Sequence, residues 1–204
     1  DPWSRIPKEY PVGSVREDAR ALSSENPALS KRELLELKIS ESLVEGNDFD
    51  LIAMGRPEGP GCYCYANNVL RDVLKEISKN YPYTIIDNEA GLENLSRRIV
   101  QSVDVLLVVG EPTRNGIETL RRIRTLATEM GIAYGKLVIA MNRVRDSSGD
   151  YEKLVREIGA DGIVLIPYND DIGLWNEEGR SFFSIPEQNV VYRIVRDAVI
   201  AKVV

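Results

Sequence analysis

Short, nearly continuous apolar runs recur along the chain, and patterns with helical periodicity separate them. The apolar runs are 51–54, 84–87, 105–109, 137–141 and 162–166. The helical patterns lie near 65–79, 92–100, 115–130 and 151–158, and a last one spans about 186–201. Apolar strands that alternate with helices are typical of a parallel sheet covered on both faces. The pattern therefore predicts an α/β fold with a doubly wound, mostly parallel sheet.

The first part of the chain follows a different pattern. Residues 1–28 are rich in Pro, Ser, Arg and Glu and have little periodicity, which predicts mostly irregular structure. Ser30 and Glu33 have the spacing of a capping box, and the apolar stripe that follows predicts a helix to about Glu45. A chain of 204 residues is long enough for one α/β core, so we expect residues 1–204 to form a single nucleotide-binding-type domain.

The composition argues against several classes of function and of binding site. The net charge of −6 argues against a nucleic-acid partner. No apolar run approaches the roughly 18 residues of a membrane span, and two cysteines do not make a disulfide framework, so we expect a cytoplasmic protein. The chain has no histidine, so any transition-metal site must use thiolate, carboxylate or backbone ligands.

Polar residues follow the predicted strands. In parallel sheets of this kind, ligands bind beyond the carboxyl ends of the strands. The segments at those ends begin at Gly55, Asp87, Glu111, Asn142 and Pro167. Their shared position predicts that a ligand binds at this one edge of the sheet.

Asp87 ends an apolar run, and Glu89 and Gly91 follow closely. An aspartate at a strand end can hold a magnesium-bound water while the Gly91 N–H reaches a γ-phosphate. Glu89 can orient a water between them. The alternative is that Asp87 only caps the following helix and that Glu89 faces solvent.

Cys62 and Cys64 follow a segment rich in glycine and proline, which predicts a loop that enters a helix. On a loop, two thiolates at this spacing can reach one metal ion, whereas on a regular helix they diverge. A tetrahedral thiolate site has four ligands, and a two-fold axis supplies the other pair from a second subunit. The alternatives are two reduced structural thiols at a turn, or a redox disulfide.

Asn142 ends the strand 137–141 and is followed by Arg143. An asparagine amide offers one donor group and one acceptor, which suits the edge of adenine. Pro167, Tyr168 and Asn169 occupy the same position after the next strand. Each of these groups alone also fits an ordinary polar loop.

The glycine-rich phosphate loop of nucleotide-binding proteins does not occur in this sequence. That loop needs the pattern G-x-x-x-x-G-K-[ST] between a strand and a helix. The nearest segment, 131–136, is one residue short and lies between a helix and a strand. We therefore expect the loop to lie upstream of Asp1 or to be lost, and in either case this segment alone should not hydrolyse ATP efficiently.

Residues 54–64, Met-Gly-Arg-Pro-Glu-Gly-Pro-Gly-Cys-Tyr-Cys, resemble the metal-binding segment of CooC-type ATPases, the nickel-insertion (maturation) factors of carbon monoxide dehydrogenase. Residues 86–97 resemble the switch segment of the same family. Residues 109–113 and 140–144 are similar to its later strands, and 166–169 to its adenine-side loop. The resemblance covers about residues 50–200. The family belongs to the wider deviant P-loop group of nitrogenase iron proteins and MinD-like ATPases.

The resemblance implies an ATP-dependent cytoplasmic homodimer that uses ATP/ADP and Mg²⁺ and binds Ni²⁺ or Zn²⁺ across its interface. It implies that Cys62 and Cys64 are metal ligands, with Asp87 and Gly91 in the switch and Asn142 at the adenine. The implied target is a nickel enzyme of the carbon monoxide dehydrogenase or acetyl-CoA decarbonylase type. The chain departs from the family in lacking the phosphate-loop lysines and the first strand.

Two other functions stay open. One is an electron-transfer ATPase with an iron–sulfur cluster between two subunits, in which a second cysteine is expected after Asp87; none is present. The other is a non-catalytic metal-binding or interaction protein.

Overall fold

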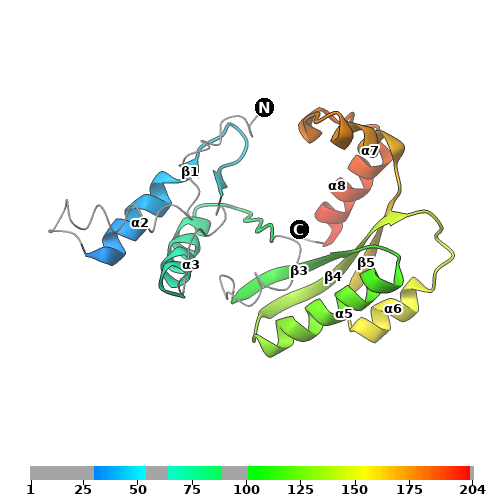
Figure 1. Cartoon of the computed structure of the whole chain (residues 1–204), viewed down its shortest axis with the longest axis horizontal. Coiled ribbons are helices and arrows are strands. Elements are labelled where there is room, and N and C mark those ends of the chain that lie inside the picture. The colour runs from blue at the N-terminus through cyan, green and yellow to red at the C-terminus, as the bar shows by residue number, and fades with distance from the viewer. Residues whose placement is uncertain (1–29, 54–63, 89–100, 203–204) are drawn as a thin grey trace. The chain divides into compact units, whose positions relative to one another are not determined.

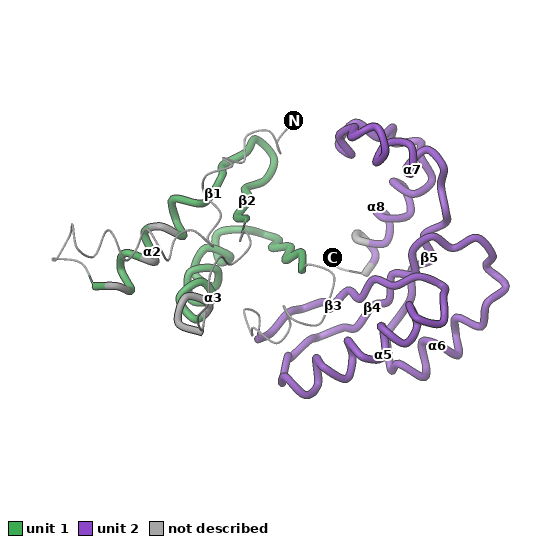
Figure 2. The backbone as a smooth tube through the Cα atoms, viewed as in Figure 1, with its two compact units in different colours: residues 1–90 green, residues 91–204 purple. Residues whose placement is uncertain are grey.

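The chain divides into two compact units, residues 1–90 and 91–204 (Figure 2). The computed structural model describes residues 30–53, 64–88 and 101–202. In these ranges, no helix is both long enough and apolar enough to cross a membrane.

Two helices and a small hairpin make up the described part of the first unit. Helix α2 (Lys31–Glu41) leads into strand β1 (Leu43–Val44), which pairs antiparallel with β2 (Leu51–Ile52), and α3 (Cys64–Ser78) follows. The capping box forms as predicted, because the Ser30 N–H donates to the Glu33 carboxylate at 2.7 Å and the Glu33 N–H donates to Ser30 Oγ at 3.3 Å. Helices α2 and α3 pack together through buried residues that include Leu34, Ile39, Val69 and Leu70.

Asp50, just before β2, links the hairpin to the segment after α3. Its carboxylate accepts hydrogen bonds from the Tyr81 hydroxyl and from the Gly46 N–H, the latter at 3.0 Å. The Tyr81 hydrogen bond is the main reason that the pKa of Asp50 lies below its ordinary value, and the same bond raises the pKa of Tyr81. One hydrogen bond therefore holds two segments that are separated by α3.

The second unit is built on a three-stranded parallel sheet. Its strands are β3 (Ser102–Gly110), β4 (Ala133–Val144) and β5 (Gly162–Pro167), in the order β3-β4-β5 (Figure 1). Gly110 pairs with Met141, so β3 and β4 end side by side. The register between β4 and β5 shifts between Met141 and Val144, after which Val144 pairs with Pro167.

Helices pack on both faces of this sheet. Helices α5 (Arg114–Glu129) and α6 (Tyr151–Ile158) enclose one face and bury Leu120, Leu154 and Ile158 against the centre of β4. The β4 residues in this core are Leu137, Ile139 and Met141, each at most 1% exposed, and Val144, which is 7% exposed. Helix α8 (Val190–Lys202) packs on β5 from the other side of the sheet (Figure 1). The α/β fold class is thus confirmed in the second unit.

Most elements of the second unit fall where the periodicity predicted them. The strands 105–109, 137–141 and 162–166 and the helices 115–130 and 151–158 are confirmed to within a few residues, and the last helix begins later, at Val190. Helix α7 (Asp170–Glu177) and the 3₁₀ turn η2 (Phe182–Ser184) were not predicted. In the first unit, the helix near 65–79 is confirmed, whereas the helix after Ser30 ends at Glu41 instead of Glu45. The helix at 92–100 falls outside the described residues.

Two predicted strands are wrong as members of the parallel sheet. Of residues 51–54, the described part (51–53) contains β2, which pairs antiparallel with β1. Residues 84–87 have no regular secondary structure, and Ile85 is 89% exposed. The physical reason is that an apolar run favours burial but does not specify a partner strand. Within the described residues, no strand pairs with 84–87.

Candidate functional site

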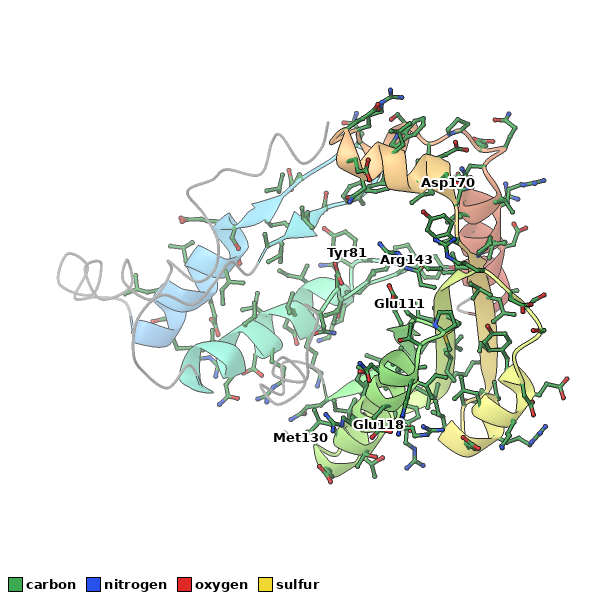
Figure 3. All side chains as sticks on the ribbon, turned by 45° about the vertical axis from the view of Figure 1, so that its right-hand side comes forward. Tyr81, Glu111, Glu118, Met130, Arg143 and Asp170 are labelled. Atoms are coloured by element: carbon green, nitrogen blue, oxygen red, sulfur yellow. The ribbon has the colours of Figure 1, made fainter. Side chains whose placement is uncertain are left out.

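The carboxyl edge of the sheet in the second unit brings together predicted site residues from three strands. Because Gly110 of β3 pairs with Met141 of β4, the residues that follow them, Glu111 and Asn142, lie at the same edge of the sheet. Figure 3 shows Glu111 and Arg143 at this end of the sheet. Arg143 Nη1 donates to Glu111 Oε1 at 3.2 Å, and both side chains are largely exposed.

Arg143 has an unusual backbone. Its φ is 56°, and it is the one non-glycine residue with positive φ in the described ranges. It lies within the register shift between Met141 and Val144. In this conformation, the Arg143 N–H donates to Oδ1 of the preceding Asn142 at 2.9 Å. A backbone N–H can only donate, so the amide oxygen of Asn142 is directed at Arg143 and its NH₂ group points elsewhere.

The start of α5 packs tightly against the same edge. Thr113 caps the helix, because its Oγ1 accepts the Gly116 N–H at 3.0 Å. A Cβ on Gly116 would overlap the Glu111 carbonyl oxygen and lie 3.0 Å from the Glu111 nitrogen. The absence of a side chain at Gly116 therefore permits the first turn of α5 to approach the backbone of Glu111.

Residues after β5 complete the edge. The Tyr168 N–H donates to the Val144 carbonyl at 2.9 Å, which continues the pairing of β4 with β5 by one residue. The guanidinium carbon of Arg145 lies 3.9 Å from the centroid of the Tyr168 ring, and that tyrosine is 40% exposed. The adjacent Asp146 is engaged by Ser148, whose hydroxyl is the main cause of a lowered Asp146 pKa. The Arg145 side chain therefore stacks on the tyrosine, while the neighbouring carboxylate bonds to Ser148.

Asn169 has a structural role at the start of α7. Its Oδ1 accepts the Ile172 N–H at 3.0 Å and caps α7, and Asn189 Nδ2 donates to the same oxygen at 3.4 Å. This side-chain oxygen holds the beginning of α7 beside β5. Pro167 ends β5 through its pairing with Val144.

The predicted switch and metal residues belong largely to segments that the structure does not describe. Asp87 is exposed in the first unit, in a stretch without regular secondary structure. Glu89, Gly91 and Cys62 lie outside the described residues. Cys64 is the first residue of α3, and its side chain is likewise outside the description. No cluster of three or more acidic or cysteine side chains suited to a metal ion occurs among the described residues.

Sequence reasoning found Asn142, Arg143 and Tyr168 from their positions at strand ends, but it missed how they interact. Glu111 had the same positional signal and was not assigned a role. Arg145 and the left-handed backbone of Arg143 had no signal, since arginine does not favour positive φ. Together these residues offer amide donors and acceptors beside a stacked arginine and tyrosine, an arrangement that suits a planar, polar ring.

The chain is similar in sequence to several known proteins. No protein-family model matches the chain. An uncharacterized ATP-binding protein of Methanocaldococcus jannaschii is 39% identical over 210 residues, which cover 97% of this chain and 82% of that protein. The carbon monoxide dehydrogenase accessory protein CooC of Rhodospirillum rubrum is 34% identical over 92 residues, 44% of this chain and 35% of CooC. The septum site-determining protein MinD of Bacillus subtilis is 24% identical over 178 residues, 79% of this chain and 66% of MinD.

Solved structures agree on the fold. A ParA family ATPase from Chlorobium tepidum superposes with a TM-score of 0.60 at 15% identity, over 95% of this chain and 77% of that one. The cell division ATPase MinD of Pyrococcus furiosus superposes with a TM-score of 0.53 at 14% identity, over 95% and 90% of the two chains. At these identities, the likeness concerns the fold alone.

Proposed function

Since the chain belongs to the MinD/ParA family of ATP-binding proteins, we propose that it binds the adenine of ATP at the carboxyl edge of β3, β4 and β5. The observation that carries this proposal is the half-buried Asn142 amide, held by the Arg143 N–H at 2.9 Å. An oriented amide is a reader of base edges, because it presents an acceptor and a donor at fixed places.

At this edge, Asn142 Oδ1 accepts from the amino group of adenine, and Nδ2 donates to the neighbouring ring nitrogen. Pro167 and Tyr168 flank the base from the end of β5, and Asn169 holds that loop by capping α7. The Arg143 guanidinium is engaged by Glu111, so its contribution to the nucleotide comes from its backbone. The site therefore binds and orients a base.

The switch is proposed to be in the first unit and the segment after it. The Asp87 carboxylate is exposed and has no hydrogen-bond or ion-pair partner among the described residues. A carboxylate oxygen of this kind fits Mg²⁺, which prefers oxygen ligands and keeps several waters. When bound, Mg²⁺ neutralises charge on the phosphates. In this proposal Asp87 holds a water of its shell, the Gly91 N–H donates to the γ-phosphate, and Glu89 orients the attacking water.

The cargo of the proposed ATPase is a soft divalent metal. Cys62 and Cys64 supply two thiolates, and a second subunit related by a two-fold axis supplies two more. Nickel and zinc both accept four sulfur ligands. The similarity to CooC over 92 residues supports nickel insertion into an enzyme of the carbon monoxide dehydrogenase type. Nucleotide-driven rearrangement of a cytoplasmic homodimer is proposed to change how the thiolates hold the metal.

The experiment compares nucleotide binding and hydrolysis in the full-length protein and in three variants. Asn142→Ala is expected to weaken ATP binding about tenfold, because it removes two hydrogen bonds to the base. Asp87→Ala should abolish hydrolysis and leave ATP binding partly intact, since the phosphate cradle is untouched. Asn176→Ala, the same truncation on exposed α7, is the matched control and should change neither quantity.

Isothermal titration calorimetry measures binding, and phosphate release measures turnover. Unchanged ATP affinity in Asn142→Ala would remove the base site from this edge. Unchanged turnover in Asp87→Ala would remove the switch assignment. A protein that takes up iron and develops iron–sulfur absorbance when purified without oxygen would favour the electron-transfer alternative. Metal uptake without any nucleotide binding would favour the non-catalytic metal-binding alternative.

A further inference from the structure

The outward face of helix α7, together with the 3₁₀ turn η2 that follows it, combines exposed apolar side chains with free carboxylates. We propose that this surface, residues 170–184, docks a basic amphipathic helix of a partner protein. It is called the α7 surface below. The α7 surface begins after Asn169, the last residue of the candidate nucleotide site, so the inference goes beyond the proposed function.

Helical spacing defines the outward face of α7. Four exposed residues share one side of the helix, because they are spaced at i, i+3, i+4 and i+7. They are Asp170, Gly173, Leu174 and Glu177. Asp170, in the first turn, is labelled in Figure 3. Ile172 and Trp175 lie on the opposite side and are half-buried. Helix α7 therefore has an inward apolar face and an outward face with a leucine near its middle.

The turn η2 adds aromatic side chains beside the last turn of α7. The Trp175 Nε1–H donates to Ser184 Oγ at 3.3 Å, and the Arg180 N–H donates to the Trp175 carbonyl oxygen at 2.9 Å. These two hydrogen bonds hold η2 against α7. The large apolar side chains exposed here are Leu174, Phe182 and Phe183, at 48%, 50% and 57%. Exposed apolar side chains with a polar rim are typical of protein interaction sites.

The rim of the α7 surface is acidic. Asp170, Asp171 and Glu177 are exposed, and their carboxylates make no hydrogen bond or ion pair with any residue that the structure describes. The one cation in this stretch of sequence, Arg180, is paired with Glu178, with 2.5 Å between Nε and Oε2. The free charge at this surface is therefore negative, and it is complementary to the Lys and Arg side chains of a partner.

Gly173 indicates that the partner approaches closely. Glycine weakens the interior of a helix relative to alanine. A Cβ at Gly173 would meet nothing within 4 Å among the described residues, so packing within the protein does not require a glycine here. The missing side chain allows another backbone to come near α7. Because the separation of two packed helices depends on the side chains at their contact, this favours a helix as the occupant.

A basic amphipathic helix suits all of these features. Its apolar stripe covers Leu174 and Phe182, and its backbone approaches Gly173. Lysine or arginine side chains beside the stripe pair with Asp170 and Glu177. Since the outward face of α7 spans about two helical turns, the contact is small and the complex is reversible.

Fluorescence anisotropy of a labelled peptide tests this inference on the full-length protein without nucleotide. The probe is a peptide of about 18 residues, five helical turns, built from Lys, Leu and Ala with the leucines on one face. In the matched peptide, every lysine is replaced by glutamate. The lysine peptide should bind. The glutamate peptide should bind at least about tenfold more weakly, because it places like charges opposite each other. Added salt should weaken binding of the lysine peptide.

Two variants alter the α7 surface, and each has a matched control. Leu174→Asp should lower the affinity for the lysine peptide about tenfold or more, because it removes the central apolar contact. Leu37→Asp makes the same change at a leucine of α2 that is 50% exposed, and it should leave the affinity unchanged. Gly173→Gln should raise Tm and lower the affinity about tenfold, since it favours the helix but obstructs the approach. Asn176→Gln, off the outward face of α7, should not change the affinity.

Thermal denaturation shows that each variant is folded, and a Gly173→Gln protein that is more stable yet binds more weakly separates docking from folding. Equal binding of the two peptides overturns the inference, as does unchanged affinity in folded Leu174→Asp or in Gly173→Gln. An equal loss in Leu37→Asp and Leu174→Asp also overturns it, because the peptide then binds elsewhere. A dimer that Leu174→Asp alone converts to a monomer in light scattering overturns it as well, since a second copy then covers this surface. The nucleotide titrations described above test the proposed function separately.

Discussion

The same chemical change, glycine to alanine, should have opposite effects at two helical positions in the second unit. Gly116 lies in the first turn of α5, and Gly173 lies within α7. A Cβ at Gly116 overlaps the Glu111 carbonyl oxygen and comes within 3.0 Å of the Glu111 nitrogen, whereas a Cβ at Gly173 meets nothing within 4 Å. The pair therefore separates close packing at the candidate site from helix propensity.

The expected magnitudes follow from these contacts. Alanine is favoured over glycine in a helix by about 1 kcal/mol, so Gly173→Ala should stabilise the protein by up to that amount. At Gly116 the same gain is opposed by overlap with backbone atoms, for which overpacking data indicate about 1–3 kcal/mol. The two variants should thus differ by about 2 kcal/mol, or about 4–8 °C in Tm for a chain of this size.

The two substitutions should also differ in their effect on ATP binding. To admit the new Cβ, the first turn of α5 must move away from the Glu111 backbone. Glu111 follows Gly110, which pairs with Met141 directly before Asn142, so a shift there reaches the edge that carries Asn142. Gly116→Ala should therefore lower ATP affinity in the full-length protein, and Gly173→Ala should leave it unchanged. Thermal denaturation followed by circular dichroism, with calorimetric titration of ATP, measures both quantities. A Gly116→Ala protein as stable as Gly173→Ala, with native ATP affinity, would refute the close packing of α5 against the edge.

Two further predictions concern the first unit. Replacing both Cys62 and Cys64 with serine should abolish the uptake of one Ni²⁺ or Zn²⁺ per dimer and weaken metal-linked dimerisation. Metal titration followed by light scattering tests this, and a double variant that still binds one metal per dimer would contradict it.

The hydrogen bond between Tyr81 and Asp50 should make the stability of the protein depend on pH at both the acidic and the alkaline extreme. Because the Asp50 pKa is lowered in the folded protein, Asp50 stabilises the fold above its unfolded-state pKa, and this stability is lost as the pH falls through the folded-state pKa. Because the Tyr81 pKa is raised, Tyr81 stabilises the fold below its unfolded-state pKa, and this stability is lost as the pH rises through the folded-state pKa. Tyr81→Phe should flatten the pH dependence of Tm at both ends, and an unaltered profile would show that the bond is not significant in solution.

The local elements of this protein could be read from its residues. The runs at 105–109, 137–141 and 162–166 form parallel strands, as continuous apolar sequence predicts. The central run, 137–141, is fully buried, whereas Leu107 and Val109 of the first run are exposed. The capping box of Ser30 and Glu33 formed as predicted, since both partners lie within one helical turn. The run at 84–87 shows the limit of this reasoning. Its two isoleucines predicted a strand, yet pairing needs a neighbouring strand that composition does not specify.

For the candidate site as well, the sequence predicted the position of some residues but not the contacts between them. The position of Asn142 at the end of a strand followed from sequence, because the carboxyl ends of parallel strands lie together. The contact of Arg143 with Glu111, the stacking of Arg145 on Tyr168 and the left-handed turn at Arg143 did not. Residue type and periodicity report on neighbours within a few positions, whereas these contacts join residues 32 and 23 positions apart. The register of β4 against β3 and β5, with its shift between Met141 and Val144, decides them, and only the assembled sheet contains that register.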